Sequence, residues 1–121
     1  MPAGAGLVVR VRSERRFLPA LLVQNVVPTP RLSGVPGSPL KLALVAGRVL
    51  PVVELGEPRG ELVVCHSDGE TVALAGLEVE LSGFFPAAGA GVLVEDQTVS
   101  ALDIAAELAR ALHPTGASRG A

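Results

Sequence analysis

The sequence has no tryptophan and no tyrosine, only three phenylalanines and one cysteine, and no long apolar run. A single cysteine excludes an internal disulfide framework and a zinc site built from cysteines. A membrane helix needs roughly 18 or more apolar residues in succession, and the nearest stretch, residues 17–30, is broken by prolines and polar residues. The first apolar segment precedes the basic residues, which is the wrong order for a secretory signal. We therefore predict a cytoplasmic protein with no membrane insertion.

The residues that are abundant point to a small β domain. The 121 residues include 18 Val, 18 Leu and 17 Ala, and apolar residues make up 49% of the chain. This apolar content is too high for a disordered chain, so we expect a packed core. The 14 Gly and 10 Pro, together with the many valines, favour short strands joined by tight turns. The length allows one domain, residues 1–121.

The charges are divided unevenly, although the net charge is only −2. Residues 1–60 carry eight basic and three acidic groups, whereas residues 61–121 carry two basic and nine acidic groups. The cluster Arg10, Arg12, Arg15 and Arg16 is the strongest candidate for nucleic-acid binding. Small barrels that bind single strands pair a basic groove with stacking aromatics, and Phe17 is the one aromatic near this cluster. We predict no nucleic-acid partner, and a solvated hairpin or a face for an acidic protein instead.

Hydrophobic periodicity and turn residues predict about eight short strands. Residues 7–12 alternate, with Leu7, Val9 and Val11 predicted inward and Val8 outward. The Asp68-Gly69 pair is a strong hairpin signal, and Pro51 predicts an edge strand or a bulge. The expected strands are residues 7–12, 17–20, 40–45, 49–55, 61–66, 71–75, 77–81 and 92–94.

The C-terminal part differs from the rest, because residues 101–112 carry an apolar stripe at helical spacing. Ser100 is the expected N-cap, with Asp103 as the acid of a capping box. His113-Pro114 should end the helix, and residues 113–121 should fray. Strands at this spacing, followed by a single helix, predict a mainly all-β fold built from a small barrel or from paired barrels.

No catalytic or metal site follows from these residues. Cys65 and His66 are adjacent, and neighbours on a strand point to opposite faces, so they cannot form a thiolate–imidazole pair. The pairs Asp68/Glu70, Glu78/Glu80 and Glu95/Asp96 lack the converging oxygen ligands of a cation site. Gly89-Ala90-Gly91 lacks the third glycine and the helix of a dinucleotide loop. We predict a protein that is not an enzyme and has no metal or cofactor.

Four motifs occur in a fixed order: F-L-P at 17–19, V-Q-N-V at 23–26, V-P-G-S-P at 35–39 and G-R-V-L-P-V-V-E-L at 47–55. This region resembles the CheW-like family, whose members couple chemoreceptors to the histidine kinase CheA in bacterial chemosensory arrays. The family pattern has a V-x-E-V turn, a V-P-G-x-P loop and the run N-L-R-G-x-V-L-P-V-x-D-L. The resemblance implies a pair of small SH3-like barrels with a groove between them, and a C-terminal helix.

The chain departs from this pattern at the charged positions. Asn25 replaces the family's glutamate, Ala46 its arginine and Leu44 its asparagine. Gly76-Leu77-Glu78-Val79 loses the aspartate of a later motif. The chain is short for the family, with no strand predicted between residues 81 and 92, so the second barrel should be reduced. These features make it similar to short, divergent adaptors such as those of the Frz chemosensory system.

The resemblance predicts a non-catalytic adaptor that binds the receptor's cytoplasmic tip, with weakened or lost coupling to the CheA-type kinase. Its partners would be a methyl-accepting chemoreceptor and, in addition, the kinase regulatory domain or another CheW-like protein. The alternatives are a full CheW-type coupling protein and a small β-barrel interaction module outside chemotaxis. We expect residues 7–112 to form a single ordered CheW-like domain. The predicted partner-binding residues are Val23, Asn25, Val26, Lys41, Leu44, Ala46 and Arg48.

Overall fold

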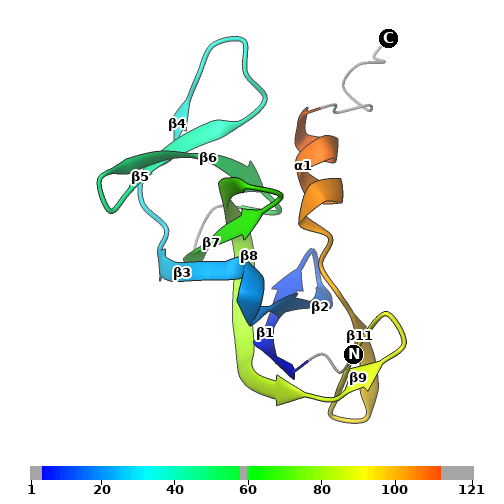
Figure 1. Ribbon diagram of the computed structural model, residues 1–121. Helices are drawn as coiled ribbons and strands as arrows, with labels where there is room; N and C mark the ends of the chain where they lie inside the picture. The colour runs from blue at the N-terminus through cyan, green and yellow to red at the C-terminus, as the bar shows by residue number, and fades with distance from the viewer. Residues whose placement is uncertain (1–3, 58–59, 113–121) are drawn as a thin grey trace, which may run out of the picture.

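The computed structural model describes residues 4–57 and 60–112, and these residues are mostly β-strand (Figure 1). The predicted frayed segment 113–121 and the helix stop at His113-Pro114 lie outside this range. The strands are β1 (Gly4–Val11), β2 (Glu14–Pro19), β3 (Val23–Pro28), β4 (Ser33–Gly34), β5 (Lys41–Val45), β6 (Arg48–Glu54), β7 (Glu61–Ser67), β8 (Glu70–Phe85), β9 (Ala87–Ala88), β10 (Gly91–Val94) and β11 (Gln97–Ser100). A 3-10 turn, η1 (Ala20–Leu22), precedes β3, and one helix, α1 (Ile104–Leu112), follows β11.

The long strand β8 connects two groups of strands. Its N-terminal half pairs with β7 on one side and with β6 on the other. β7 also pairs with β3, and β6 also pairs with β5, which pairs with β4. Its C-terminal half pairs with β1, and β1 pairs with β2. The short strands β9, β10 and β11 form a separate sheet beside this second group, joined to β2 by a bridge between Phe17 and Ala101. Neither group closes into a barrel through the strand pairs of the described residues, although the predicted mainly β fold is confirmed.

Two hairpin turns have the same backbone conformation, and the sequence predicts the one at Asp68-Gly69. Asp68 and Gly69 both have positive φ, 52° and 79°, in the turn between β7 and β8, as a type I′ hairpin requires. Ala46 and Gly47 have the same combination, 51° and 79°, in the turn between β5 and β6. Each turn fixes the register of its hairpin and therefore decides which side chains face the core.

The prediction for Val8 is wrong, because both Val8 and Val9 are buried. The pairing of β1 with β8 shifts between these two residues. Val9 packs in a core with Leu18, Leu74 and other residues of the first group, whereas Val8 packs in a second core with Phe17. A strand that lies between two cores buries both of its faces, so the alternation rule for a half-buried strand fails.

The prediction of an edge strand or bulge at Pro51 is right only locally, because β6 as a whole is not an edge strand but Pro51 pairs with β5 alone. β6 lies between β5 and β8, and its parallel ladder with β8 begins at Val52. Pro51 therefore precedes the first pair of that ladder, so the ladder loses no hydrogen bond through the missing N–H of proline. The segment between residues 81 and 92, in which we predicted no strand, contains the end of β8 and the short strand β9.

Helix α1 begins later than predicted. Ser100 ends β11, and the Oδ1 of Asp103 accepts a hydrogen bond of 3.0 Å from the backbone N–H of Ala106. Asp103 is therefore the N-cap, because its carboxylate satisfies an N–H group that the first helical turn leaves free. Ile104 and Leu108 pack the helix onto the core of the first group. Among the described residues, no helix has the length and apolar content to cross a bilayer.

Candidate functional site

An apolar groove lies between the two strand groups. Its volume is about 280 Å³, and its walls come from β3 on one side and from β1 and β8 on the other. In the β1–β8 ladder, Ala5 is opposite Phe84 and Leu7 is opposite Ser82. Because alternate residues share a face, these two pairs face the groove together. The lining residues are Ala5, Gly6, Leu7, Ala20, Val23, Val26, Ser82, Gly83 and Phe84.

Two of the predicted binding residues, Val23 and Val26, meet in this groove because β3 contains an irregularity. They are three positions apart, so a regular strand would place them on opposite faces. The register of β3 with β7 shifts between Val23 and Asn25. A bulge at that point lets two residues occupy the space of one, which brings Val23 and Val26 to the same side.

Phe84 lines the groove although no sequence motif singles it out. Phe85 packs edge-on against Phe17, with ring centroids 6.0 Å apart and an interplanar angle of 78°. Phe84, next to it on the strand, points the other way and is 82% exposed. The signal was present in the sequence, because two adjacent phenylalanines on one strand must point to opposite faces. An exposed aromatic side chain beside an apolar groove is typical of a protein-binding surface.

The other predicted residues do not line this groove. Asn25 is exposed on β3, while Lys41, Leu44, Ala46 and Arg48 belong to the β5–β6 hairpin, which does not pair with β3. The Nζ of Lys41 lies 3.5 Å from a carboxylate oxygen of Glu54 on the neighbouring strand. Of the seven predicted residues, two therefore line the groove, four lie on the hairpin, and Asn25 lies on β3 outside both surfaces.

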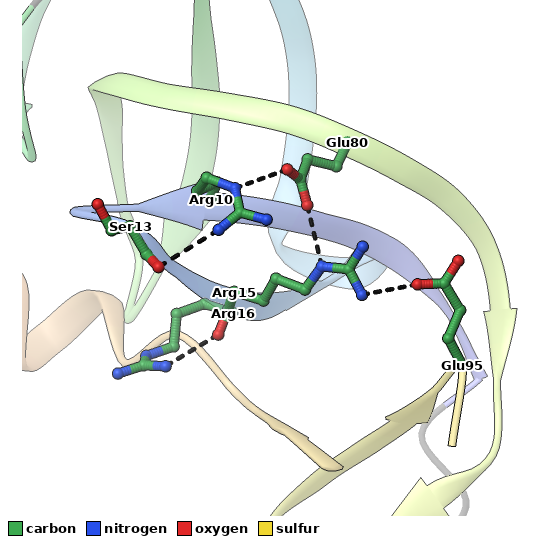
Figure 2. A network of polar contacts seen from close by, with 6 residues as sticks. All are labelled: Arg10, Ser13, Arg15, Arg16, Glu80 and Glu95. Atoms are coloured by element: carbon green, nitrogen blue, oxygen red, sulfur yellow. Dashed lines mark hydrogen bonds and ion pairs between the residues drawn. The ribbon is translucent and has the colours of Figure 1, made fainter. Parts of the chain in front are cut away.

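The arginine cluster is neutralised within the molecule, and Figure 2 shows the part of this network around Arg10 and Arg15. Glu80 accepts hydrogen bonds from the Nε atoms of both Arg10, at 2.7 Å, and Arg15, at 3.0 Å. The Nη1 of Arg15 also donates to Glu95, at 2.9 Å. Arg12 pairs with Glu107 on α1, and Arg16 pairs with Glu14. These guanidinium groups already form ion pairs with carboxylates of the same chain. The cluster is therefore a structural network, and it offers little positive charge to the phosphates of a nucleic acid.

These pairs also shift the ionisation of the groups involved. The hydrogen bond from Arg10, supported by Arg15, lowers the pKa of Glu80. The hydrogen bonds to Glu95 and Glu80 raise the pKa of Arg15. Burial alone would raise the pKa of Glu107, but the hydrogen bonds and charges of Arg12 and Arg110 outweigh it and lower the pKa. All three groups therefore keep their charges at neutral pH.

Cys65 has the environment of a core residue. Its side chain is buried, and burial raises the pKa of the thiol to about 12, so the nucleophilic thiolate is scarce at neutral pH. His66 lies on the exposed face, where its Nδ1 is 3.4 Å from the hydroxyl of Thr71. Within residues 4–57 and 60–112, no three His, Cys, Asp or Glu side chains come together as a metal site would require.

The chain has the fold of a CheW scaffolding protein. No family model and no curated protein matches the sequence. The structure is similar to the crystal structure of the scaffolding protein TtCheW from Thermoanaerobacter tengcongensis, with a TM-score of 0.65. The two are 12% identical in sequence, and the similarity covers 86% of each chain.

Proposed function

We propose that this protein is a non-catalytic adaptor of a bacterial chemosensory array, and that it binds a chemoreceptor tip in the groove between its strand groups. The single observation that carries this proposal is the apolar lining of that groove, with Phe84 exposed beside it. The fold shared with a CheW scaffolding protein supports it. The protein would be cytoplasmic. It would consist of a single CheW-like domain that spans residues 1–121.

The chemistry of the groove fits an apolar helical partner. Val23, Val26, Leu7 and Phe84 offer apolar surface, and Ser82 is the one polar side chain in the lining. Burial of apolar surface drives most protein association, at roughly 25 cal/mol for each Å² removed from water. A coiled-coil tip with apolar residues at its surface would fill the groove between β3 and the β1–β8 ladder.

We also propose that the coupling of this protein to the kinase is weakened. Where the family pattern has a charged pair, this chain has Asn25 on β3 and Ala46 in the β5–β6 turn. Charged groups at an interface set orientation and partner choice. Without them, the hairpin surface keeps apolar contacts but loses this source of specificity, as in the short adaptors of the Frz type.

Two other functions are compatible with this fold. A full CheW-type coupling protein would bind both the receptor tip and the kinase regulatory domain with similar strength. A β-module outside chemotaxis would bind neither. The exposed apolar surface of the β5–β6 hairpin, which includes Leu44 and Val49, favours a second protein contact and so keeps the full coupling protein as the second candidate.

A binding experiment with paired variants tests the proposal. Val26→Glu places a charge in the groove, whereas Val35→Glu changes a residue outside it; both valines are 37% exposed. Isothermal titration calorimetry would measure the affinity of each variant for a receptor-tip fragment and, separately, for the kinase regulatory domain. We expect Val26→Glu to weaken receptor binding at least tenfold and Val35→Glu to leave it within twofold.

Three results would contradict parts of this proposal. Equal losses for both valine variants would show that the groove is not the receptor site. Tight binding of the kinase domain, with kinase activation in a reconstituted array, would identify the full coupling protein. The absence of binding to either fragment would favour the module outside chemotaxis.

A further inference from the structure

A second groove, separate from the proposed receptor site, lies between helix α1 and the turn that joins β7 to β8. Its volume is about 320 Å³. The buried side chains of Val72 and Ile104 reach its floor, and Leu108 and Leu112 of the helix form one wall. The opposite wall carries the carboxylates of Asp68 and Glu70.

Among the described residues, the charged side chains that line this groove are of one sign. Successive helical residues are rotated by about 100°, so Ala105, Leu108, Ala109 and Leu112 share one side of α1. Glu107 and Arg110 lie on the opposite side, where Arg12 and Arg110 both pair with Glu107. The groove side of the helix therefore presents no cation.

The two acidic residues of the rim are available to a ligand. Neither Asp68 nor Glu70 has an ion pair or a side-chain hydrogen bond within the described part of the chain, and both are exposed. The positive φ of Asp68 and Gly69 holds the turn that presents them. An apolar floor with an acidic rim is complementary to a segment that carries apolar side chains on one face and basic ones beside them.

We propose that this groove binds a basic amphipathic helix of another protein. Ala105 and Ala109 are small and one helical turn apart, which allows a second helix to approach α1 closely. Apolar side chains of the partner would enter between Leu112 and the floor at Val72. Lysine or arginine side chains on the flank of the partner helix would pair with Asp68 and Glu70.

Residues 4–57 and 60–112 do not supply such a segment. Within the described residues α1 is the one α-helix, and its polar side carries Glu107 beside Arg110, so a second copy offers no basic amphipathic helix. Residues 113–121 contain one arginine, which is one cation for the two carboxylates of the rim. The groove is thus better matched by a different protein.

Fluorescence anisotropy with a labelled 18-residue leucine–lysine peptide of helical periodicity would test this proposal. A scrambled peptide of the same composition controls for charge alone. The variant Leu112→Lys puts a cation on the apolar wall, where it repels a basic peptide, and Leu93→Lys is its matched control, because the two leucines are 43% and 39% exposed. We expect the periodic peptide to bind, the scrambled peptide to bind at least tenfold more weakly, and Leu112→Lys alone to weaken binding at least tenfold.

A second pair of variants tests the acidic rim. Asp68→Asn with Glu70→Gln removes two carboxylates, and Asp96→Asn with Glu78→Gln removes two others that do not line the groove. We expect the first pair to weaken binding three- to tenfold and to reduce its salt dependence, and the second pair to change it less than twofold. Thermal melting of each variant would confirm that it is folded.

Several outcomes would overturn the proposal. Equal binding of the scrambled peptide, equal losses in the control variants, or no binding of the periodic peptide would each do so. Sedimentation equilibrium tests whether a second copy of this chain occupies the groove instead. A wild-type dimer that Leu112→Lys converts to a monomer would show that a second copy fills the groove. None of these results bears on Val26, so failure here is distinct from failure of the receptor proposal.

Discussion

Leu44 and Val49 lie directly opposite each other across the β5–β6 hairpin, and each is 64% exposed. The next pair on the same face, Leu42 and Pro51, is also apolar. In an antiparallel sheet, the face that points to solvent is usually polar. An apolar outer face of this kind indicates a surface that another protein covers.

A charge on this hairpin should abolish binding of the second partner that Leu44 and Val49 contact, while the receptor tip still binds in the groove and the domain stays folded. In Leu44→Asp the side chain stays in solvent when the protein is alone, so folding is retained, but in a complex the carboxylate would be buried without a partner. Ala46→Asp should act in the same way, because aspartate tolerates the positive φ of this turn. Calorimetry with the kinase regulatory domain would measure the loss, and calorimetry with the receptor-tip fragment would check that the groove still binds.

Leu93→Asp on β10 is the control for the hairpin variants, since Leu93 is also partly exposed and lies on another sheet. Val49→Asp should reproduce the effect of Leu44→Asp, because the two residues share the same patch. Unchanged binding of both partners to Leu44→Asp and Ala46→Asp would place the site of the second partner elsewhere.

Substitution of Gly76 and of Gly69 should differ in cost, because only one of the two sites adds a steric clash to an unfavourable backbone conformation. Both have positive φ, 82° and 79°, but a Cβ on Gly76 would lie 2.4 Å from the backbone of Gly56, whereas a Cβ on Gly69 would meet open space. Gly69→Ala should cost about 1–2 kcal/mol for the left-handed conformation alone. Gly76→Ala adds a backbone clash, so its cost should exceed that of Gly69→Ala. Urea unfolding of the two variants would measure the difference, and equal costs would contradict the close approach.

The sequence predicted those features that depend on neighbouring residues. The turn at Asp68-Gly69 followed from residues that accept positive φ, and the opposite faces of Cys65 and His66 followed from the alternation of a strand. Where the prediction failed, the cause was tertiary. Val8 is buried because a second core lies on the other face of β1, and no local pattern specifies that core.

The candidate site could be predicted only in part for the same reason. Val23 and Val26 were identified through the family motif, but the bulge that turns both into the groove depends on pairing with β7. Phe84 lies at the groove because of the β1–β8 ladder, which pairs residues that are far apart in the sequence. The uneven charge also has a tertiary explanation, because arginines near the N-terminus pair with Glu80, Glu95 and Glu107.

Cys65 should not react with thiol reagents while the protein is folded. Burial raises the pKa of its thiol to about 12, so almost no thiolate is present between pH 7 and pH 9, and the side chain is out of contact with reagent. Labelling with iodoacetamide, followed by mass spectrometry, should show modification only after denaturation. The double variant Cys65→Ala, His66→Cys moves the thiol to the exposed face and should be labelled rapidly in the folded state. Rapid labelling of native wild-type protein would contradict the buried position.

Glu80 should make the stability of the protein depend on pH in the acid range. Arg10 and Arg15 lower its pKa in the folded state below the ordinary value of 4.5. The stabilisation is therefore complete above about pH 4.5 and is lost as the pH falls through the folded-state pKa. Glu80→Gln should reduce the free energy of unfolding at pH 7 by at most about 1 kcal/mol, because the pairs are partly exposed and screened by solvent.

The control for Glu80 is Glu78, two residues away on β8, which is exposed and has no ion pair within the described residues. Denaturant unfolding of wild type, Glu80→Gln and Glu78→Gln at several pH values between 7 and 2 would test the prediction. The difference between wild type and Glu80→Gln should shrink as the pH falls below 4.5, because the protonated carboxyl no longer attracts Arg10 and Arg15. A difference that stays constant with pH, or one that Glu78→Gln reproduces, would show that the network with Arg10 and Arg15 does not stabilise the fold.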